Sequence, residues 1–325
     1  MTRITVLLTL ALAQTASTTP APPTPREIAK NTYVLPGAVP PDRGPDGNTV
    51  IYLAPNGLIV VDTGRHPWHS DGILNFARDR KMPVTVIINT HWHLDHSSGN
   101  SRVKAAYPGA KMYTTTAVNR AIAPGGFLWR RYDATRAKPV DPNAPAVEQE
   151  ETKLFLATME KADLLRPDVP VERAAMLDLA GHKLSVQVAA NAVTDADLWL
   201  YDESTRVAVL GDLVTFPAPF FETACPARWE TALDEVWTTA FELAVPGHGA
   251  PMSREQFNTY RAAFKRFRAC VATDGPAAAC AAGWTKDIAP FLSSGADRRQ
   301  STEYASYYVG FLRKGGGASP ECQLK

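Results

Sequence analysis

Four side chains that commonly bind metal ions lie within a single run of six residues. They are His91, His93, Asp95 and His96. Burying a neutral polar group without a partner costs roughly 2 to 7 kcal/mol, so a folded core does not collect several of them without compensation. A divalent cation provides that compensation, because imidazole nitrogens and carboxylate oxygens are common metal ligands. The run therefore predicts a metal site; the alternative is a surface loop that happens to be rich in histidine.

The residues on either side of this run predict how it is positioned. Residues 84–88 read Val-Thr-Val-Ile-Ile, a β-branched stretch that is typical of a buried strand. Residues 97–100 read Ser-Ser-Gly-Asn, a polar stretch that can open a helix. We therefore expect the histidines at the carboxyl end of a strand, with Asp95 and His96 in a strand-to-helix turn.

Three further motifs accompany this run in a fixed order. Val60-Val61-Asp62-Thr63-Gly64 precedes it, Gly211-Asp212 follows an apolar stretch at residues 207–210, and Pro246-Gly247-His248-Gly249 follows residues 243–245. Together the motifs resemble those of the metallo-β-lactamase superfamily from about residue 50 to residue 250. The segment after Asp212, with its Pro, Phe and Cys residues, is also similar to exported metallohydrolase-like proteins associated with quinoprotein systems.

The resemblance implies an α+β fold, the four-layer αβ/βα metallo-β-lactamase sandwich, with a dinuclear metal site, usually zinc, at one edge. It assigns His91 and His93 to the first metal and Asp95, His96 and His248 to the second. Asp212 would bridge the two metals. We therefore expect one or two zinc ions per chain.

One family ligand is missing from this sequence. The superfamily normally supplies a third histidine to the first metal from a turn before a strand, and the matching position here is Val193. A valine cannot bind a metal. The first site would keep only His91, His93 and the bridging Asp212, whereas catalytic zinc sites usually have three protein ligands and a water.

Several residues could replace the missing ligand or support the others. Asn191 and Asp195 flank the vacant position, and His66 and His69 follow the early motif. For the two histidines the alternative is an ordinary contact with solvent or with the wall of a pocket. We expect Asp62 to orient a ligand imidazole by a hydrogen bond rather than to bind the metal directly. The alternative role for Asp62 is to cap the turn.

The predicted site favours hydrolysis. Bound zinc lowers the pKa of water toward ~7 and polarises the carbonyl or phosphoryl oxygen that is attacked. Asp212 would bridge the metals and Asp95 could relay a proton to the leaving group. We therefore expect an exported zinc-dependent hydrolase of an ester, thioester, amide or lactam bond in a small-molecule substrate. The alternatives are a non-catalytic metal-binding or accessory periplasmic protein with a degenerate first site, and an iron-dependent redox variant.

The N-terminal residues predict export. Arg3 precedes an apolar run over residues 4–12, and Ala11-Leu12-Ala13 resembles a cleavage site, so residues 1–17 read as a signal peptide and leader. The run is too short for a membrane span of ~20 residues. Residues 18–28 read as a disordered mature N-terminus. The mature protein would be periplasmic or secreted, without stable membrane insertion.

The cysteines agree with an oxidising compartment. The chain has 4 of them, with no Cys-x-x-Cys pair. We predict disulfides between Cys270 and Cys280 and between Cys225 and Cys322, although four cysteines allow three connectivities.

The remaining expectations concern domains and partners. We predict a metallo-β-lactamase-fold domain at residues 29–265, a lid-like insertion at residues 119–172 within it, and a C-terminal helical extension at residues 266–325. Lys plus Arg number 34 and Asp plus Glu 33, a net charge of +1, so the composition does not indicate nucleic-acid binding. A periplasmic protein partner fits the accessory alternative.

Two pairs of residues could contact a substrate. Phe220 and Phe221, after Asp212, could form a pocket wall, but we expect both to pack in the core. Arg130 and Arg131 could bind a substrate anion, or they could lie on a solvated face.

Overall fold

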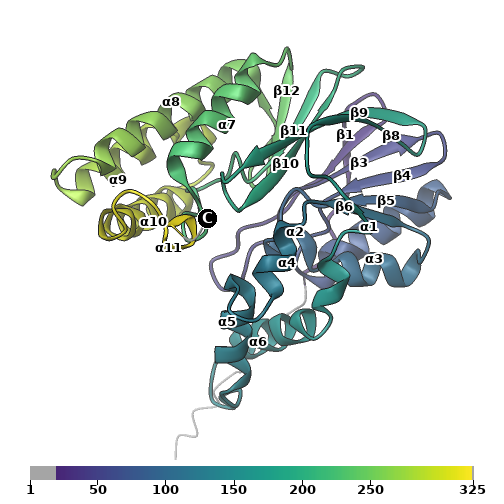
Figure 1. The fold of residues 1–325 in the computed structure, drawn as a ribbon, viewed down its shortest axis with the longest axis horizontal. Helices are drawn as coiled ribbons and strands as arrows, with labels where there is room; N and C mark the ends of the chain where they lie inside the picture. The colour runs from purple at the N-terminus through teal and green to yellow at the C-terminus, as the bar shows by residue number, and fades with distance from the viewer. Residues whose placement is uncertain (1–19, 324–325) are drawn as a thin grey trace, which may run out of the picture.

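The computed structural model of the chain describes residues 20–323, which form two sheets packed face to face with helices on the outer sides (Figure 1). The first sheet has its strands in sequence order, antiparallel from β1 to β4 and parallel from β4 to β7. Its strands are β1 (Arg26–Ala29), β2 (Thr32–Leu35), β3 (Thr49–Ala54), β4 (Gly57–Val61), β5 (Val84–Ile88), β6 (Lys111–Thr114) and β7 (Val169–Pro170).

The second sheet has the order β13-β12-β11-β10-β9-β8. Only β11 and β12 run parallel to each other, and the other neighbours are antiparallel. Its strands are β8 (Ala175–Leu179), β9 (His182–Ala190), β10 (Ala196–Asp202), β11 (Val207–Gly211), β12 (Leu243–Pro246) and β13 (Met252–Ser253).

Three apolar clusters define four layers. Between the sheets, side chains such as Val50 and Ile59 pack against Leu198 and Val209 of the opposite sheet. Helices α1 (Pro67–Arg80) and α3 (Asn100–Ala106) cover the outer face of the first sheet. Helices α7 (Pro226–Thr238) and α8 (Arg254–Val271) cover the outer face of the second. The predicted α+β four-layer sandwich is confirmed.

The insertion (residues 119–172) is helical and has a small core of its own. Its elements, with their neighbours, are α2 (Leu94–Ser97), α4 (Ala117–Ile122), α5 (Phe127–Arg136), α6 (Ala146–Met159) and the 3-10 helix η1 (Ala162–Leu165). Leu128 and Met159 pack with Trp92 and Leu94, the residues interspersed among the metal-ligand candidates. The insertion therefore rests directly on the histidine-rich segment. Helix α6 ends at Met159, and η1 begins at Ala162.

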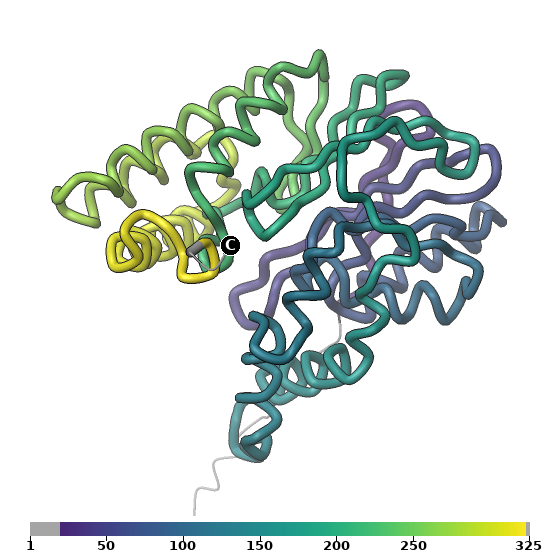
Figure 2. The backbone as a smooth tube through the Cα atoms, viewed as in Figure 1, coloured from purple at the N-terminus to yellow at the C-terminus, as the bar shows by residue number. Residues whose placement is uncertain are grey.

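The C-terminal extension (residues 266–325, described to residue 323) consists of the end of α8 and of α9 (Ala277–Asp287), the 3-10 helix η2 (Ala289–Phe291), α10 (Gly295–Lys314) and α11 (Pro320–Gln323). Because α8 runs through residues 265 and 266, the extension continues the helical layer, and Trp284 and Val309 share one core with Trp229. Figure 2 shows the yellow end of the chain returning to the green segment that precedes α7. The Cys225–Cys322 and Cys270–Cys280 disulfides are confirmed.

The N-terminal expectation needs one correction. Residues 26–28 are not disordered, because they belong to β1, in which Arg26 pairs with Val34 and Glu27 with Tyr33. The predicted signal peptide and leader, residues 1–17, lie outside the described residues. Within residues 20–323 no helix combines the length and apolar character that crossing a membrane requires.

Candidate metal centre

Four strands deliver the candidate ligands to one edge of the sandwich. Asp62 follows β4 and His91 follows β5, two neighbouring parallel strands of the first sheet. Asp212 follows β11 and His248 follows β12, the parallel pair of the second sheet. Parallel neighbours end at the same edge, so residues far apart in the sequence meet there. Gly247 permits this approach, since a Cβ atom on it would lie 2.1 Å from the Asp212 Oδ1 atom.

One group of four side chains could hold a metal ion. Asp95, His96, Asp212 and His248 each offer one ligand atom, and these atoms all lie within 4.8 Å of one another. His248 Nε2 is 2.9 Å from Asp95 Oδ2 and 3.5 Å from Asp212 Oδ1. His96 Nε2 is 3.1 Å from the same Asp212 oxygen. We call these four residues the four-ligand group.

A second group consists of His91, His93 and Asp212, whose ligand atoms also lie within 4.8 Å of one another. Here the other carboxylate oxygen is involved: Asp212 Oδ2 is 3.5 Å from His91 Nε2 and 3.8 Å from His93 Nδ1. Asp212 thus faces each group with a different oxygen, which is the geometry required of a bridging ligand. We call these three residues the three-ligand group.

Asp62 orients two of the ligand imidazoles. Its Oδ2 atom accepts a hydrogen bond from His96 Nδ1 at 2.8 Å and another from the Thr90 hydroxyl at 2.8 Å. Because the Thr90 hydroxyl donates to Asp62, it accepts from His91 Nδ1, 2.9 Å away. Both histidines therefore carry their proton on Nδ1 and leave Nε2 free to bind a metal.

Thr223 orients the third imidazole. Its hydroxyl donates to the Val193 backbone carbonyl at 2.9 Å, so it accepts the hydrogen bond from His93 Nε2, 3.0 Å away. This fixes the proton on Nε2 and leaves His93 Nδ1 as the ligand atom. The main chain at the position of the missing histidine thus supports a ligand that remains.

Two observations favour a cation at this site. His91 Nε2 and Asp212 Oδ1 are buried and have no hydrogen-bond partner, which is costly in a protein interior unless another group binds them. Burial raises the pKa of Asp212, but the charges of His96 and His248 outweigh it and hold this pKa well below its usual range. Burial and the neighbouring His91 lower the pKa of His93 to about 4. A neutral imidazole and an ionised carboxylate are the forms that bind metals, so the donor set fits a divalent ion.

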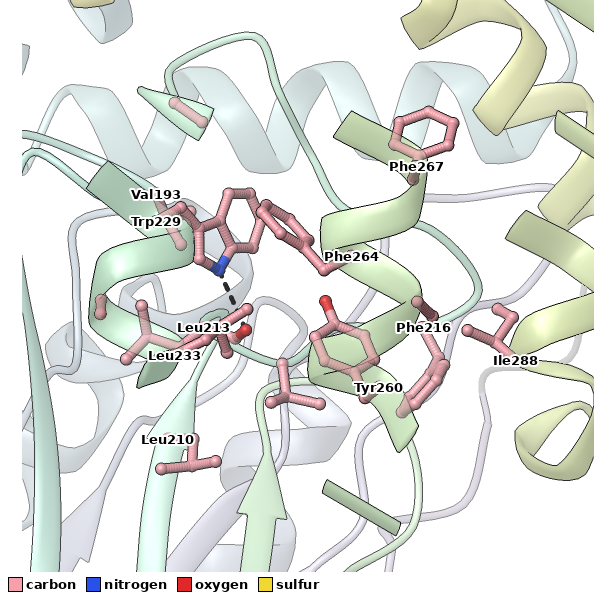
Figure 3. Packing of buried hydrophobic residues seen from close by; sticks show 14 of the residues in the cluster. Val193, Leu210, Leu213, Phe216, Trp229, Leu233, Tyr260, Phe264, Phe267 and Ile288 are labelled. Atoms are coloured by element: carbon pink, nitrogen blue, oxygen red, sulfur yellow. Dashed lines mark hydrogen bonds between the residues drawn. The ribbon is translucent and has the colours of Figure 1, made fainter. Parts of the chain in front are cut away.

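Val193 belongs to the hydrophobic core. Its side chain is fully buried in the cluster that contains Leu213, Trp229 and Leu233 (Figure 3). Trp229 is held in place there by the hydrogen bond from its Nε1 to the Leu213 carbonyl, 3.0 Å away (Figure 3). Apolar packing therefore surrounds the side chain at position 193.

The residues considered as replacement ligands are engaged elsewhere. His66 lies between two carboxylates, with Nδ1 2.8 Å from Asp46 and Nε2 2.6 Å from Glu151, so neither ring nitrogen is available and His66 is corrected to a structural contact. His69 is buried and hydrogen bonds to Thr49 through Nε2.

Of the two replacement candidates near Val193, Asp195 is engaged as well. The Asp195 carboxylate forms an ion pair with Arg120. Asn191 sits in the turn before β10 with φ 55°, and its backbone N–H donates to the Asp195 carbonyl. The structure thus offers no replacement imidazole or carboxylate from this set.

A cleft of about 660 Å³ opens above the two ligand groups. His93, Asp95, Asp212 and His248 form its floor. Phe220 lines it, and its ring packs edge-on against His93 with the centroids 5.2 Å apart. Phe220 is partly buried and also packs against the core cluster, so it does both, whereas Phe221 is fully buried in the core as expected.

Two supporting residues were not found from the sequence. Thr90 could have been, because it directly precedes His91 and a hydroxyl there can reach the ring. Thr223 lies 130 residues from His93, and nothing in its local sequence indicates the contact. Arg131 lines the cleft and lies 4.0 Å from Glu222, whereas Arg130 pairs with Glu321.

The comparisons with known proteins agree with this architecture. The family model of the metallo-beta-lactamase superfamily matches residues 43–252, more than half of the chain. The chain therefore belongs to the metallo-beta-lactamase superfamily, whose members are typically metal-dependent hydrolases. A search of curated protein sequences found no match.

Solved structures share the fold at low sequence identity. A metallo-beta-lactamase from Pontibacter korlensis is 17% identical with a TM-score of 0.54, and the match covers 75% of this chain and 99% of that one. DIM-1 metallo-beta-lactamase exposed to ceftazidime is 12% identical with a TM-score of 0.52, covering 73% and 94%. TMB-1 is 13% identical with a TM-score of 0.53, covering 75% and 97%.

Proposed function

We propose that the protein is an exported zinc-dependent hydrolase that cleaves an ester, thioester, amide or lactam bond in a small-molecule substrate. The observation that carries this proposal is the Asp212 carboxylate, which directs one oxygen to the four-ligand group and the other to the three-ligand group at the floor of an open cleft. Membership of the superfamily supports hydrolysis as the reaction class.

The protein's own residues would bind the metal and keep its ligands in position. The four-ligand group would hold the tighter zinc ion, and His91 and His93 would hold a second ion with Asp212. When bound, zinc would lower the pKa of water toward ~7 and polarise the carbonyl that is attacked. Asp62 and Thr223 keep the ligand nitrogens facing the metals. Asp95 is 16% exposed to the cleft and is placed to pass a proton to a leaving group.

The compartment forms part of the proposal. Two disulfides join the only four cysteines of the chain, and disulfides persist in oxidising compartments. With the apolar run at residues 4–12, this supports a periplasmic or secreted protein.

A second candidate function is a metal-binding accessory role without turnover. It is favoured by Val193, because the three-ligand group lacks an imidazole that superfamily members normally have. The two functions are distinguished by assaying the zinc-loaded protein against chromogenic ester, thioester, amide and lactam substrates. Turnover of one class that is lost on chelation supports the hydrolase. Tight zinc binding with no turnover of any class supports the accessory role and contradicts the hydrolase.

A further inference from the structure

The rim of the cleft carries exposed aromatic side chains from the C-terminal extension. Among the described residues, four large hydrophobic side chains are exposed, and two of them, Tyr304 at 43% and Tyr307 at 55%, lie on α10 and line the cleft. The other two, Val169 and Met176, are not among its lining residues. Exposed apolar groups gathered beside a pocket are typical of a binding surface.

An unbroken series of aromatic contacts connects the candidate ligands to this rim. His93 packs edge-on against Phe220 at 5.2 Å between ring centroids. Phe220 packs against Tyr308 at 6.3 Å, and Tyr308 against Tyr307 at 5.0 Å. One wall of the cleft is therefore aromatic from the metal ligands to the solvent.

The opposite wall, from the insertion, is also aromatic. Phe127 of α5 and Phe155 of α6 line the cleft, together with Trp92 beside the ligands. Trp92 and Phe127 are in contact, with their ring centroids 5.6 Å apart. A molecule that enters the cleft thus meets aromatic rings on two sides.

One ion pair joins the insertion to the extension, and a second joins the insertion to the segment between Asp212 and Cys225. Arg130 of α5 pairs with Glu321 of α11. Arg131 lies 4.0 Å from Glu222, in the segment between Asp212 and Cys225. The Cys225–Cys322 disulfide fixes α11 to the end of the same segment. Both aromatic walls are therefore held in position before a ligand arrives, which lowers the entropic cost of binding.

The charges in the walls are compensated within the protein. Arg65 pairs with Glu151 at 2.8 Å, Arg131 faces Glu222, and the Arg43 guanidinium lies 5.3 Å above the ring of Trp68. An apolar group suits these walls better than a highly charged one.

We propose that the cleft selects acyl compounds that carry an aromatic or similarly bulky apolar group, and that Tyr304, Tyr307 and Tyr308 determine this specificity. The proposal rests on the proposed hydrolase function, since it names the substrate class of the same site. The metal ligands at the floor would meet the carbonyl, while the apolar group lies between Phe127 and Phe155 on one side and the three tyrosines on the other.

Binding of a non-hydrolysable probe tests this proposal without turnover. 2-Naphthylacetate and acetate share a carboxylate and differ in the aromatic ring, so each is titrated into the zinc-loaded protein by calorimetry. We expect naphthylacetate to bind about 100-fold more tightly than acetate, because an aromatic group gains most from burial between rings. Equal affinities for the two probes would overturn the proposal.

Variants assign the effect to the extension. Tyr307→Ala should weaken naphthylacetate binding about fivefold and Tyr304→Ala/Tyr307→Ala about tenfold or more, while acetate binding stays unchanged. Met176→Ala is the matched control, since Met176 is 51% exposed and does not line the cleft. Unchanged naphthylacetate affinity in the double variant would contradict the role of the tyrosines.

The same measurements separate the two proposals. If naphthylacetate binds selectively through the tyrosines but no substrate class is hydrolysed, the proposed hydrolase function is overturned and the proposed recognition of an aromatic group is retained. Hydrolysis with equal kcat/KM for methyl acetate and methyl phenylacetate would retain the hydrolase and overturn the substrate class.

Discussion

The two candidate metal-binding groups share Asp212 but differ in the number of ligands and in what surrounds them. The four-ligand group combines Asp95, His96 and His248 with one Asp212 oxygen. The three-ligand group has two imidazoles and the other oxygen, and the nearby Val193 is packed into the core. The same set of strand ends therefore brings four candidate ligands to one group and three to the other. We infer that the first zinc binds to the four-ligand group and the second binds more weakly.

Removing a ligand of the four-ligand group should have the largest effect. His248→Ala should lower kcat/KM by about a thousandfold or more and abolish the tight zinc, because several kcal/mol of charge stabilisation are lost. Steady-state kinetics and zinc titration measure the two effects. His182→Ala is the matched control, since His182 pairs with Asp202 away from the site. An active His248→Ala enzyme with tight zinc would contradict the assignment.

Removing the acceptor that orients the ligands should have the next largest effect. Asp62→Asn disturbs His96 directly and His91 through Thr90, so it should weaken zinc binding or activity by about 10- to 100-fold. Competition with a fluorescent chelator measures the zinc affinity. Full affinity in this variant would show that Asp62 only caps the turn after β4.

Thr223→Val should affect the weak site alone. The hydroxyl accepts the hydrogen bond from His93 Nε2 and donates to the Val193 carbonyl, so the second zinc should bind about tenfold more weakly while the first is unchanged. A two-step zinc titration resolves the two affinities. Equal weakening of both steps would contradict the division of the site into two groups.

Val193→His tests the difference between the two groups by adding a possible ligand to the three-ligand group instead of removing one. A histidine there should tighten the second zinc, and overpacking of the core around Trp229 and Leu213 should cost about 1–3 kcal/mol of unfolding free energy. Zinc titration and denaturant unfolding measure the two changes, with Val193→Leu as the control for packing alone. An unchanged second affinity in a folded variant would show that position 193 does not face the metal.

The smallest effect concerns the contact of the insertion with the sandwich. Burial lowers the pKa of His66, but its hydrogen bonds to Asp46 and Glu151 outweigh this and raise the pKa above 6.5. Burial raises the pKa of Glu151, yet His66 and Arg65 hold it below 4.5. The stability that charged His66 gives to this contact is therefore complete below pH 6.5 and is lost as the pH rises through the raised pKa of His66. The stability that ionised Glu151 gives is complete above pH 4.5 and is lost as the pH falls through the lowered pKa of Glu151.

We accordingly expect proteolysis of the insertion to accelerate as the pH rises from 6.5 through the raised pKa of His66. Glu151→Gln should reduce this pH dependence, because the carboxylate partner of His66 is gone. A native protein whose insertion is cleaved at the same rate across this range would contradict the role of His66.

The sequence predicted the features that depend on local order. The ligand motifs each follow a strand, and the strand ends of a known fold meet, so His91, Asp212 and His248 could be placed together. The two disulfides followed from spacing and compartment. Contacts that depend on tertiary packing were not visible: Glu151 lies 85 residues from His66 and Thr223 lies 130 residues from His93. The aromatic wall of α10 was missed because a helical tyrosine pattern does not reveal which cleft it faces.

Zinc titration of the chelator-stripped protein, followed by elemental mass spectrometry, measures whether the two ligand groups bind zinc unequally. We expect two steps: one zinc ion per chain that is retained on dialysis, and a second that binds at least about tenfold more weakly and is lost. Two ions retained with equal affinity would contradict the inequality of the two groups, and no retained zinc would contradict the metal centre itself.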